Sequence, residues 1–221
     1  MKVVAVIPAY NESSMIADVV QKTVSFADEV VVIDDGSTDR TGEAARQAGA
    51  RVYRHAINRG LGASLATGIA AAMKRGADVI VTLDADGQHD PSEIPNFVRA
   101  IEERKVDAVI GSRFLETIDM PFLRRVYNRI GNVLTYLLFG IRTTDSQSGF
   151  RAFTRHGASR LELKTNRMEV SSEFLKEIHD KRLSFCEIPC SVKYTDYSMS
   201  KGQSLGVGVS TAFKLVLRRL M

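Results

Sequence analysis

The chain has 221 residues, of which 44% are hydrophobic and 25% are charged. This length can bury a core without disulfides, and the composition is that of ordinary globular proteins, which excludes disordered and fibrous classes. A mean hydropathy of -0.08 excludes a mostly membrane-embedded chain, and no run approaches the roughly 18 uncharged apolar residues that span a bilayer. The 30 basic and 26 acidic residues give a net charge of +4. This excess is too small to indicate a nucleic acid, and no nucleic-acid partner is predicted.

Short apolar runs alternate with helix-like segments, which predicts an α/β fold with a mostly parallel sheet flanked by helices. The runs are residues 3–9, 30–34, 52–54, 79–83 and 106–111. The first run is broken by Pro8 and lacks a cleavage pattern, so it is interpreted as a buried strand rather than a signal peptide.

Helical spacing of apolar residues predicts a first helix over residues 12–26, with Asn11 and Ser13 as candidate caps. Another helix is predicted from about residue 91 to residue 104. Asp90 can cap it, Pro suits its first position, and Glu93 stands where a capping box places its acid.

The second half contains a long segment, residues 120–141, that is both apolar and basic. It predicts either one or two helices packed in the core or a pair of helices partly sunk into a membrane interface. Residues 168–181 are predicted to be helical, residues 188–194 alternate as a strand, and residues 205–221 form a further amphipathic element.

The two cysteines, Cys186 and Cys190, are four residues apart in one predicted strand. Both would point to the same face about 13 Å apart, beyond disulfide reach. They are interpreted as thiols in a reducing cytoplasm.

Polar side chains follow the predicted strands at their carboxyl ends, where open parallel sheets bind ligands. These stretches are residues 8–12, 34–37, 84–89 and 111–113. Each stretch alone has an ordinary explanation as a turn, a helix cap or a solvated loop. Together they bring carboxylates, a tyrosine and an arginine toward one crevice.

Several acids at one sheet edge repel one another unless a cation lies among them. A divalent cation that bridges a diphosphate would offset this repulsion. Oxygen ligands from Asp84, Asp86 and Gln88 suit Mg²⁺ or Mn²⁺ rather than Zn²⁺. His89 either completes this set of ligands or stands at the entry of the helix after Asp90.

A nucleotide pocket is predicted beside the metal. Asp34 or Asp35 would accept hydrogen bonds from a base or ribose, and a ring would stack near Tyr10. The glycines of residues 58–62 would let the backbone approach a ligand closely, although this segment lacks the lysine pattern of a phosphate-binding P-loop.

These motifs, in this order, resemble glycosyltransferase family 2, whose members have the GT-A fold. Within that family the chain is similar to dolichyl-phosphate mannose synthases and bacterial polyprenyl-phosphate glycosyltransferases, from residue 3 to about residue 202. The motifs that carry the resemblance are residues 6–12, 32–39, 58–60, 84–89, 111–113, 145–151 and 197–202.

The resemblance implies a metal-dependent, inverting transfer of a sugar, with mannose or glucose favoured, from a GDP- or UDP-linked donor to a polyprenyl phosphate. Family positions would assign the nucleoside to Pro8, Ala9, Tyr10, Glu12, Asp34 and Asp35; the metal to Asp84, Asp86 and Gln88, with Asp84 also at the ribose; and the acceptor phosphate or diphosphate to Arg113, Arg124, Arg125, Arg129, Arg151 and Lys201.

Asp86 and Arg113 would thus act at the reacting groups, and Asp145 is a third candidate there. Asp145 could be a base, a ligand of a sugar hydroxyl or a loop-start cap, and donor-sugar or structural duty is favoured. An ionised phosphate acceptor needs no general base, unlike a hydroxyl.

The resemblance predicts one GT-A catalytic domain over residues 1–221, with a nucleotide- and metal-binding half at 1–115 and an acceptor-binding half at 116–221. Longer family members carry transmembrane helices that this chain does not show. Peripheral attachment to the cytoplasmic face is therefore predicted, through residues 120–141 and the tail. An integral membrane partner or a homo-oligomer is compatible with this.

Three alternatives stay open. A family 2 transferase for a soluble hydroxyl acceptor would need Asp145 as the base. A sugar-phosphate nucleotidyltransferase would show a glycine-rich basic loop after the first strand, and residues 8–12 do not form one. A non-catalytic nucleotide-sugar-binding subunit would bind nucleotide and metal without transfer.

Overall fold

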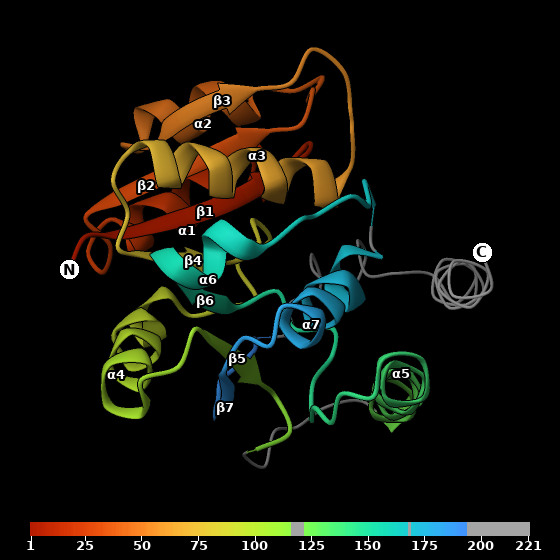
Figure 1. Cartoon of the computed structure of the whole chain (residues 1–221). Helices are drawn as coiled ribbons and strands as arrows, with labels where there is room; N and C mark the ends of the chain where they lie inside the picture. Colours follow the sequence, from red (N-terminus) through yellow and green to blue (C-terminus); the bar gives the residue numbers. More distant parts are fainter. Residues whose placement is uncertain (116–121, 168, 194–221) are drawn as a thin grey trace.

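The strands of the protein form a single seven-stranded sheet in the order β3-β2-β1-β4-β6-β5-β7. We describe a computed structural model, in which residues 1–115, 122–167 and 169–193 are placed. The strands are β1 (Val3–Ala9), β2 (Glu29–Asp34), β3 (Arg51–Arg54), β4 (Val79–Thr82), β5 (Ala108–Ser112), β6 (Arg151–Thr154) and β7 (Phe185–Pro189). Helices cover both faces of the sheet (Figure 1).

Every pair of neighbouring strands is parallel except those that include β6. The mostly parallel sheet predicted from the sequence is therefore confirmed, and β6 is the strand that the apolar pattern missed. Because β6 runs in the opposite direction, its first residue, Arg151, pairs with Thr82 and Ile110 near the carboxyl ends of β4 and β5. This places the segment just before β6 at the ligand-binding edge.

Each face of the sheet has its own hydrophobic cluster. One cluster contains Val3, Ala5 and Ile7 of β1, and the other contains Val4 and Val6, as the two-residue repeat of a strand requires. The first cluster is covered by α1 (Ile16–Thr23), α2 (Thr41–Gln47) and α4 (Ile94–Arg104), and the second by α3 (Leu61–Lys74), α6 (Arg155–Arg160) and α7 (Val170–Asp180).

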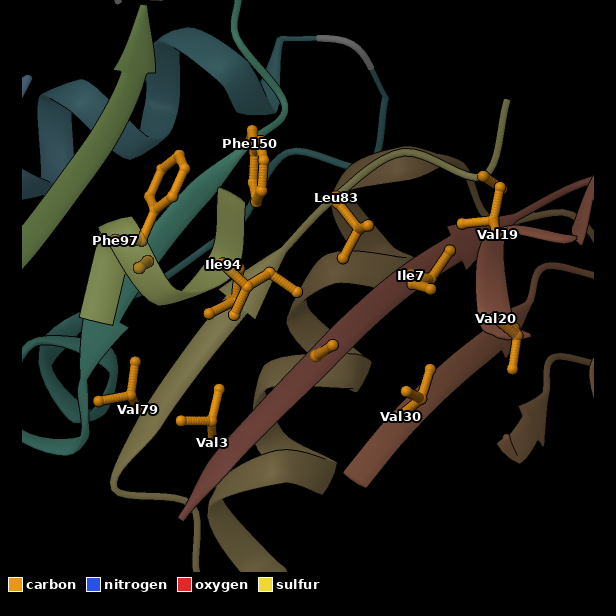
Figure 2. Close-up of a cluster of buried hydrophobic side chains, with 14 of the residues drawn as sticks. Val3, Ile7, Val19, Val20, Val30, Val79, Leu83, Ile94, Phe97 and Phe150 are labelled. Atoms are coloured by element: carbon orange, nitrogen blue, oxygen red, sulfur yellow. The ribbon is translucent and has the colours of Figure 1, made fainter. Parts of the chain in front are cut away.

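Figure 2 shows the first cluster, in which Ile7 of β1 and Leu83 gather on one face of the sheet with Val19 of α1 and Ile94 of α4. Phe97 of α4 stacks on Phe150, with ring centroids 4.2 Å apart. Burying a phenylalanine side chain completely contributes roughly 1.5–3 kcal/mol relative to leaving it exposed. Phe150 directly precedes β6, so this contact also fixes the start of that strand.

The predicted helices are confirmed, but two of their caps are wrong. Helix α1 begins at Ile16 without a side-chain cap, and Asn11 instead accepts a hydrogen bond from the backbone N–H of Thr38 at 2.9 Å. A 3₁₀ turn, η1 (Pro91–Glu93), leads into α4, and Asp90 caps it through Ser92. Glu93 does not close the box, because its carboxylate accepts from Ser191, 98 residues away.

The apolar and basic segment forms one helix, α5 (Phe122–Phe139). Val126, Ile130, Val133 and Leu137 lie along one stripe of α5 and are exposed, which fits the interface interpretation better than a core helix. No helix in the described part of the chain has the length and apolar character needed to cross a membrane.

The strand predicted at residues 188–194 is shifted. It is β7, which begins at Phe185 and ends at Pro189, and Val192 beyond it makes only an isolated bridge with His89. The same-face prediction for the cysteines is confirmed. Cys186 and Cys190 are free thiols that both pack against the first cluster. The predicted amphipathic element at residues 205–221 lies outside the described residues.

Candidate active site

The predicted strand-end residues gather at the carboxyl edge of the sheet, as parallel pairing requires. Pro8 and Ala9 are the last residues of β1, and both are buried in the sheet. The Tyr10 ring that follows them is 44% exposed, so it can stack on a ligand. The Glu12 carbonyl accepts from the backbone N–H groups of Met15 and Ile16 and starts the turn into α1.

Asp34 and Asp35 are both buried, but they point to different parts of the protein. One Asp34 oxygen accepts from the backbone of Ser37 at 3.0 Å, and the other lies where a Cβ on Gly42 of α2 would be only 2.6 Å away. Asp34 therefore organises the β2–α2 loop under α2, while its second oxygen has no hydrogen-bond partner among the described residues and lies 3.5 Å from the Nε of Arg54. Its assignment to a nucleotide stays a prediction.

Asp35 accepts three hydrogen bonds within the protein. They come from the His55 ring at 2.6 Å, from the backbone of Arg59 at 2.9 Å and from the backbone of Gly60 at 2.7 Å. Asp35 therefore joins β2 to the residue 58–62 loop, and it would meet a base only as part of this network.

The glycines of that loop serve the protein's own backbone. A Cβ on Gly60, whose φ is +95°, would lie 2.2 Å from the Asn166 carbonyl oxygen, and one on Gly62 would lie 1.9 Å from that of Thr165. The close approach of residues 165–166 accounts for both glycines, and the approach of a ligand to this loop stays a prediction. Glu173 holds residues 165–166 by accepting from the backbone of Thr165 at 2.9 Å.

Asp84 and Asp86 follow β4 and are close enough to influence each other's ionisation. Burial and the Asp84 charge raise the pKa of Asp86 to about 6. Burial also tends to raise the pKa of Asp84, but a hydrogen bond from His89 and the charges of His89, Arg151 and Arg113 lower it overall. The Asp84 side chain is nevertheless 40% exposed at the carboxyl edge of the sheet.

Asp86 resists ionisation because it is buried and lies beside the Asp84 charge, and a bound cation would favour its ionised form. Two carboxylates with the Gln88 amide would form an oxygen donor set that suits Mg²⁺ or Mn²⁺. Among residues 1–115, 122–167 and 169–193, no three His, Cys, Asp or Glu side chains form a cluster that could hold a metal alone. The residues thus fit a metal that shares its coordination with a bound diphosphate.

The His89 ring lies inside the protein, between Asp84 and Phe150. Its Nε2 is 3.4 Å from an Asp84 oxygen, its ring is tilted against Phe150, and only 7% of the residue is exposed. The contact supports Asp84 from within the protein. The interpretations of His89 as a metal ligand and as a residue at the helix entry both stay predictions.

Gly149 makes room for the same carboxylate. A Cβ on Gly149 would lie 2.4 Å from one Asp84 oxygen and 2.7 Å from the other. The Gly149 carbonyl accepts from the Thr82 hydroxyl at 2.9 Å, which ties the segment before β6 to β4. Only a glycine at 149 therefore leaves Asp84 where it is.

Arg113 follows β5 and is locked to Asp145. Its Nε and Nη2 donate to the two Asp145 oxygens at 2.6 and 2.7 Å, and its backbone N–H donates at 3.2 Å. The Asp145 side chain has no exposed surface, and that of Arg113 is 13% exposed. Asp145 is thus a buried orienting group for an arginine, which leaves it poorly placed to accept a proton from an acceptor.

The other predicted cations are spread more widely. Arg151 is 2% exposed, lies over the Phe174 ring at 4.8 Å, and has two guanidinium nitrogens, Nε and Nη2, without a hydrogen-bond partner among the described residues. Burial lowers its pKa to about 10, against the opposing charges of Asp84 and Asp145. Arg129 is exposed on α5, whereas the side chain of Arg124 and all of Lys201 lie outside the described residues.

Sequence reasoning missed the residues that hold the site in place. These residues are Gly149, which lies within the motif at residues 145–151, Glu187 and His55. Nothing in a single sequence marks them, because each acts through a partner at least 20 residues away.

An open α/β sheet that gathers an acidic pair and a held arginine at its carboxyl edge fits the architecture of a GT-A glycosyltransferase. The family model for glycosyl transferase family 2 matches residues 4–161, and the chain belongs to this family. It is therefore a glycosyltransferase enzyme.

Two curated relatives match almost the whole chain. An uncharacterized protein of Methanocaldococcus jannaschii is 40% identical and covers 99% of this chain and 93% of its own length. A UDP-N-acetylglucosamine–dolichyl-phosphate N-acetylglucosaminyltransferase of Methanococcus voltae is 33% identical, with 97% and 95% covered.

Another curated relative matches a shorter part of the chain, and a solved structure has a similar fold. An undecaprenyl-phosphate mannosyltransferase of Micrococcus luteus is 32% identical over 69% of this chain and 66% of its own length. Glucosyl-3-phosphoglycerate synthase from Mycobacterium tuberculosis superposes with a TM-score of 0.78 over 99% of this chain and 79% of that chain, at 22% identity. This last similarity shows the GT-A fold.

Proposed function

We propose that the protein transfers a hexose from a nucleotide-diphosphate sugar to a polyprenyl phosphate, with inversion at the anomeric carbon. The observation that carries the proposal is the buried pair of Arg113 and Asp145, which presents an oriented cation at the site and engages both oxygens of the Asp145 carboxylate. The named acceptors of the relatives, dolichyl phosphate and undecaprenyl phosphate, support it.

A phosphate acceptor explains why such a site can work without a base. A phosphate monoester is already ionised near neutral pH, so its oxygen can attack the anomeric carbon without losing a proton. The protein then has to align the attacking oxygen with the departing diphosphate and offset negative charge. Arg113 is suited to the acceptor phosphate, because Asp145 fixes the plane of its guanidinium.

Asp84, Asp86 and Gln88 would hold Mg²⁺ or Mn²⁺, and this metal would offset the charge that develops on the leaving diphosphate. The Mycobacterium tuberculosis enzyme was crystallised with Mn²⁺ and UDP, which is consistent with this assignment. Pro8, Ala9, Tyr10 and Glu12 would line the nucleoside side.

The remaining cations would have different roles, which depend on how deeply each is buried. Arg151 is too deeply buried to approach a phosphate as placed, so we assign it the electrostatic support of Asp84 and Asp145. Arg129 on the exposed side of α5, with Arg124 and Lys201, would meet the acceptor phosphate or the headgroups around it.

The acceptor's long apolar chain requires contact with a membrane, and α5 offers a surface for it. Val126, Ile130, Val133 and Leu137 are 37–68% exposed along one stripe. Such a helix lies in the interface with its apolar stripe buried and its arginines at headgroup depth. We therefore propose peripheral attachment to the cytoplasmic face of the membrane.

The test is sugar transfer in detergent to a short polyprenyl phosphate, with GDP-mannose, UDP-glucose and UDP-N-acetylglucosamine as donors and product masses as the readout. A polyprenyl-phosphate sugar whose formation stops with EDTA is the expected result. Transfer to soluble hydroxyl acceptors alone would favour the second family 2 activity. Metal-dependent nucleotide binding without transfer or donor hydrolysis would indicate a binding subunit.

A further inference from the structure

Glu187 of β7 lies beside the candidate site and takes no part in the functions described above. Its carboxylate accepts hydrogen bonds from three consecutive residues of the loop that carries Asp145. The donors are the Thr143 hydroxyl at 2.7 Å, the Thr144 backbone at 2.9 Å, the Thr144 hydroxyl at 3.0 Å and the Asp145 backbone at 3.3 Å.

The same loop holds Arg113 on two sides. Asp145 holds the guanidinium. The Thr144 hydroxyl lies 2.6 Å from that of Ser112, and the Ser112 oxygen accepts from the Phe114 backbone at 3.2 Å. Because Thr144 also donates to Glu187, the residues before and after Arg113 are tied to one carboxylate.

The negative charge of the Glu187 carboxylate is as important for holding the loop as its position. At least four N–H and O–H groups converge on it, and a carboxylate can accept all of them because it has no hydrogen of its own. All four donors reach Oε1, and the Thr144 backbone N–H also reaches Oε2 at 3.1 Å. A glutamine would keep an uncharged oxygen toward the four donors and turn its N–H₂ group toward the Thr144 N–H, so the loop and the carboxylate of Asp145 would be held less firmly.

We propose that Glu187 is a positioning residue for the acceptor phosphate, acting on Arg113 through Thr144 and Asp145. The proposal rests on the proposed function of Arg113. Preorganised side chains depend on such outer partners, and loss of one typically lowers ligand affinity or activity by about 10- to 100-fold.

The test compares Glu187→Gln with Glu29→Gln, a matched loss of a multiply bonded carboxylate on β2, in the other half of the sheet. Glu29 contacts Lys2, Arg51 and Arg75. In Glu187→Gln we expect the KM for polyprenyl phosphate to rise about ten-fold while the KM for the donor stays the same. In Glu29→Gln the melting temperature should fall while both KM values stay the same.

A second readout does not depend on activity. The Arg113 Nε–H should exchange slowly with water in ¹⁵N NMR spectra, because it donates to a carboxylate with no exposed surface. Its signal is assigned by its loss in Arg113→Lys. Glu187→Gln should speed this exchange, whereas Glu29→Gln should not. If Glu187→Gln does not fold, Thr143→Val and Thr144→Val each remove one donor and should change both readouts in the same direction.

The proposal is overturned if Glu187→Gln lowers only the melting temperature and leaves both the Nε–H exchange and the acceptor KM unchanged. A different result separates it from the proposed function. If Arg113→Lys leaves the acceptor KM unchanged while Glu187→Gln still speeds the exchange, the positioning link stands and the proposed role of Arg113 fails.

Discussion

Replacing Asp145 with asparagine separates a base from an orienting group. The structure gives Asp145 two hydrogen bonds to the Arg113 guanidinium, both charge-assisted and both buried. Asparagine keeps one oxygen acceptor and loses the charge, so one such bond is lost. Hydrogen bonds to charged groups are worth about 1.5–3 kcal/mol, and about 1.4 kcal/mol corresponds to a factor of ten.

We therefore expect Asp145→Asn to lower kcat/KM for polyprenyl phosphate by about 10- to 150-fold. Donor binding, measured by calorimetry with UDP or GDP and Mn²⁺, should stay the same. Arg113→Ala should lower kcat/KM similarly, and the double variant should be little worse than Arg113→Ala alone, because both residues act as one unit.

A base would behave differently. General-base catalysis contributes about 10²- to 10⁴-fold, and its loss would remove a limb of the pH–rate profile. The orienting account is refuted if Asp145→Asn removes that limb, or if the losses in Asp145→Asn and Arg113→Ala simply multiply in the double variant.

Three further predictions concern the metal pair and the membrane. The pKa of Asp86 is raised to about 6 from 3.8, so the folded state retains its proton longer than the unfolded state. Stability without metal should then fall as pH rises from about 4 to 6, and Asp86→Asn should melt higher than wild type at pH 7 yet bind no Mn²⁺ with nucleotide. A melting curve that shows no such gain would contradict the assignment. Gly149→Ala should weaken Mn²⁺ binding by displacing Asp84, whereas Gly131→Ala, whose Cβ would meet nothing closer than 3.7 Å, should not; equal effects would refute the steric argument. Leu137→Glu should reduce flotation with anionic liposomes without changing nucleotide binding, and unchanged flotation would remove α5 from the interface.

The sequence was sufficient to predict the sheet and the clustering of the site. Runs such as residues 3–9 are apolar enough to be buried on both faces of a sheet. The carboxyl ends of parallel strands lie at the same edge of that sheet, whatever the order of the strands. Those two facts predict the strands β1, β2 and β4 and the gathering of Asp84 and Asp86 at the carboxyl edge.

The parts that failed depend on partners distant in the chain. β6 is four residues long and pairs antiparallel, so no local pattern separates it from a loop. Glu93 satisfies every local requirement of a capping box, yet Ser191 provides a competing donor. Gly60 and Gly62 suit a ligand loop equally well, and only the fold shows that residues 165–166 approach them closely.

The most direct test of the central claim is transfer to a polyprenyl phosphate compared with the matching free polyprenol. Both acceptors are supplied in the same detergent with the preferred donor and metal, and the product masses are measured by mass spectrometry. The account predicts a sugar phosphodiester from the phosphate and no product from the alcohol, because an ionised acceptor needs no base. Equal transfer to the alcohol would contradict it, since an active base would then have to exist beside Arg113.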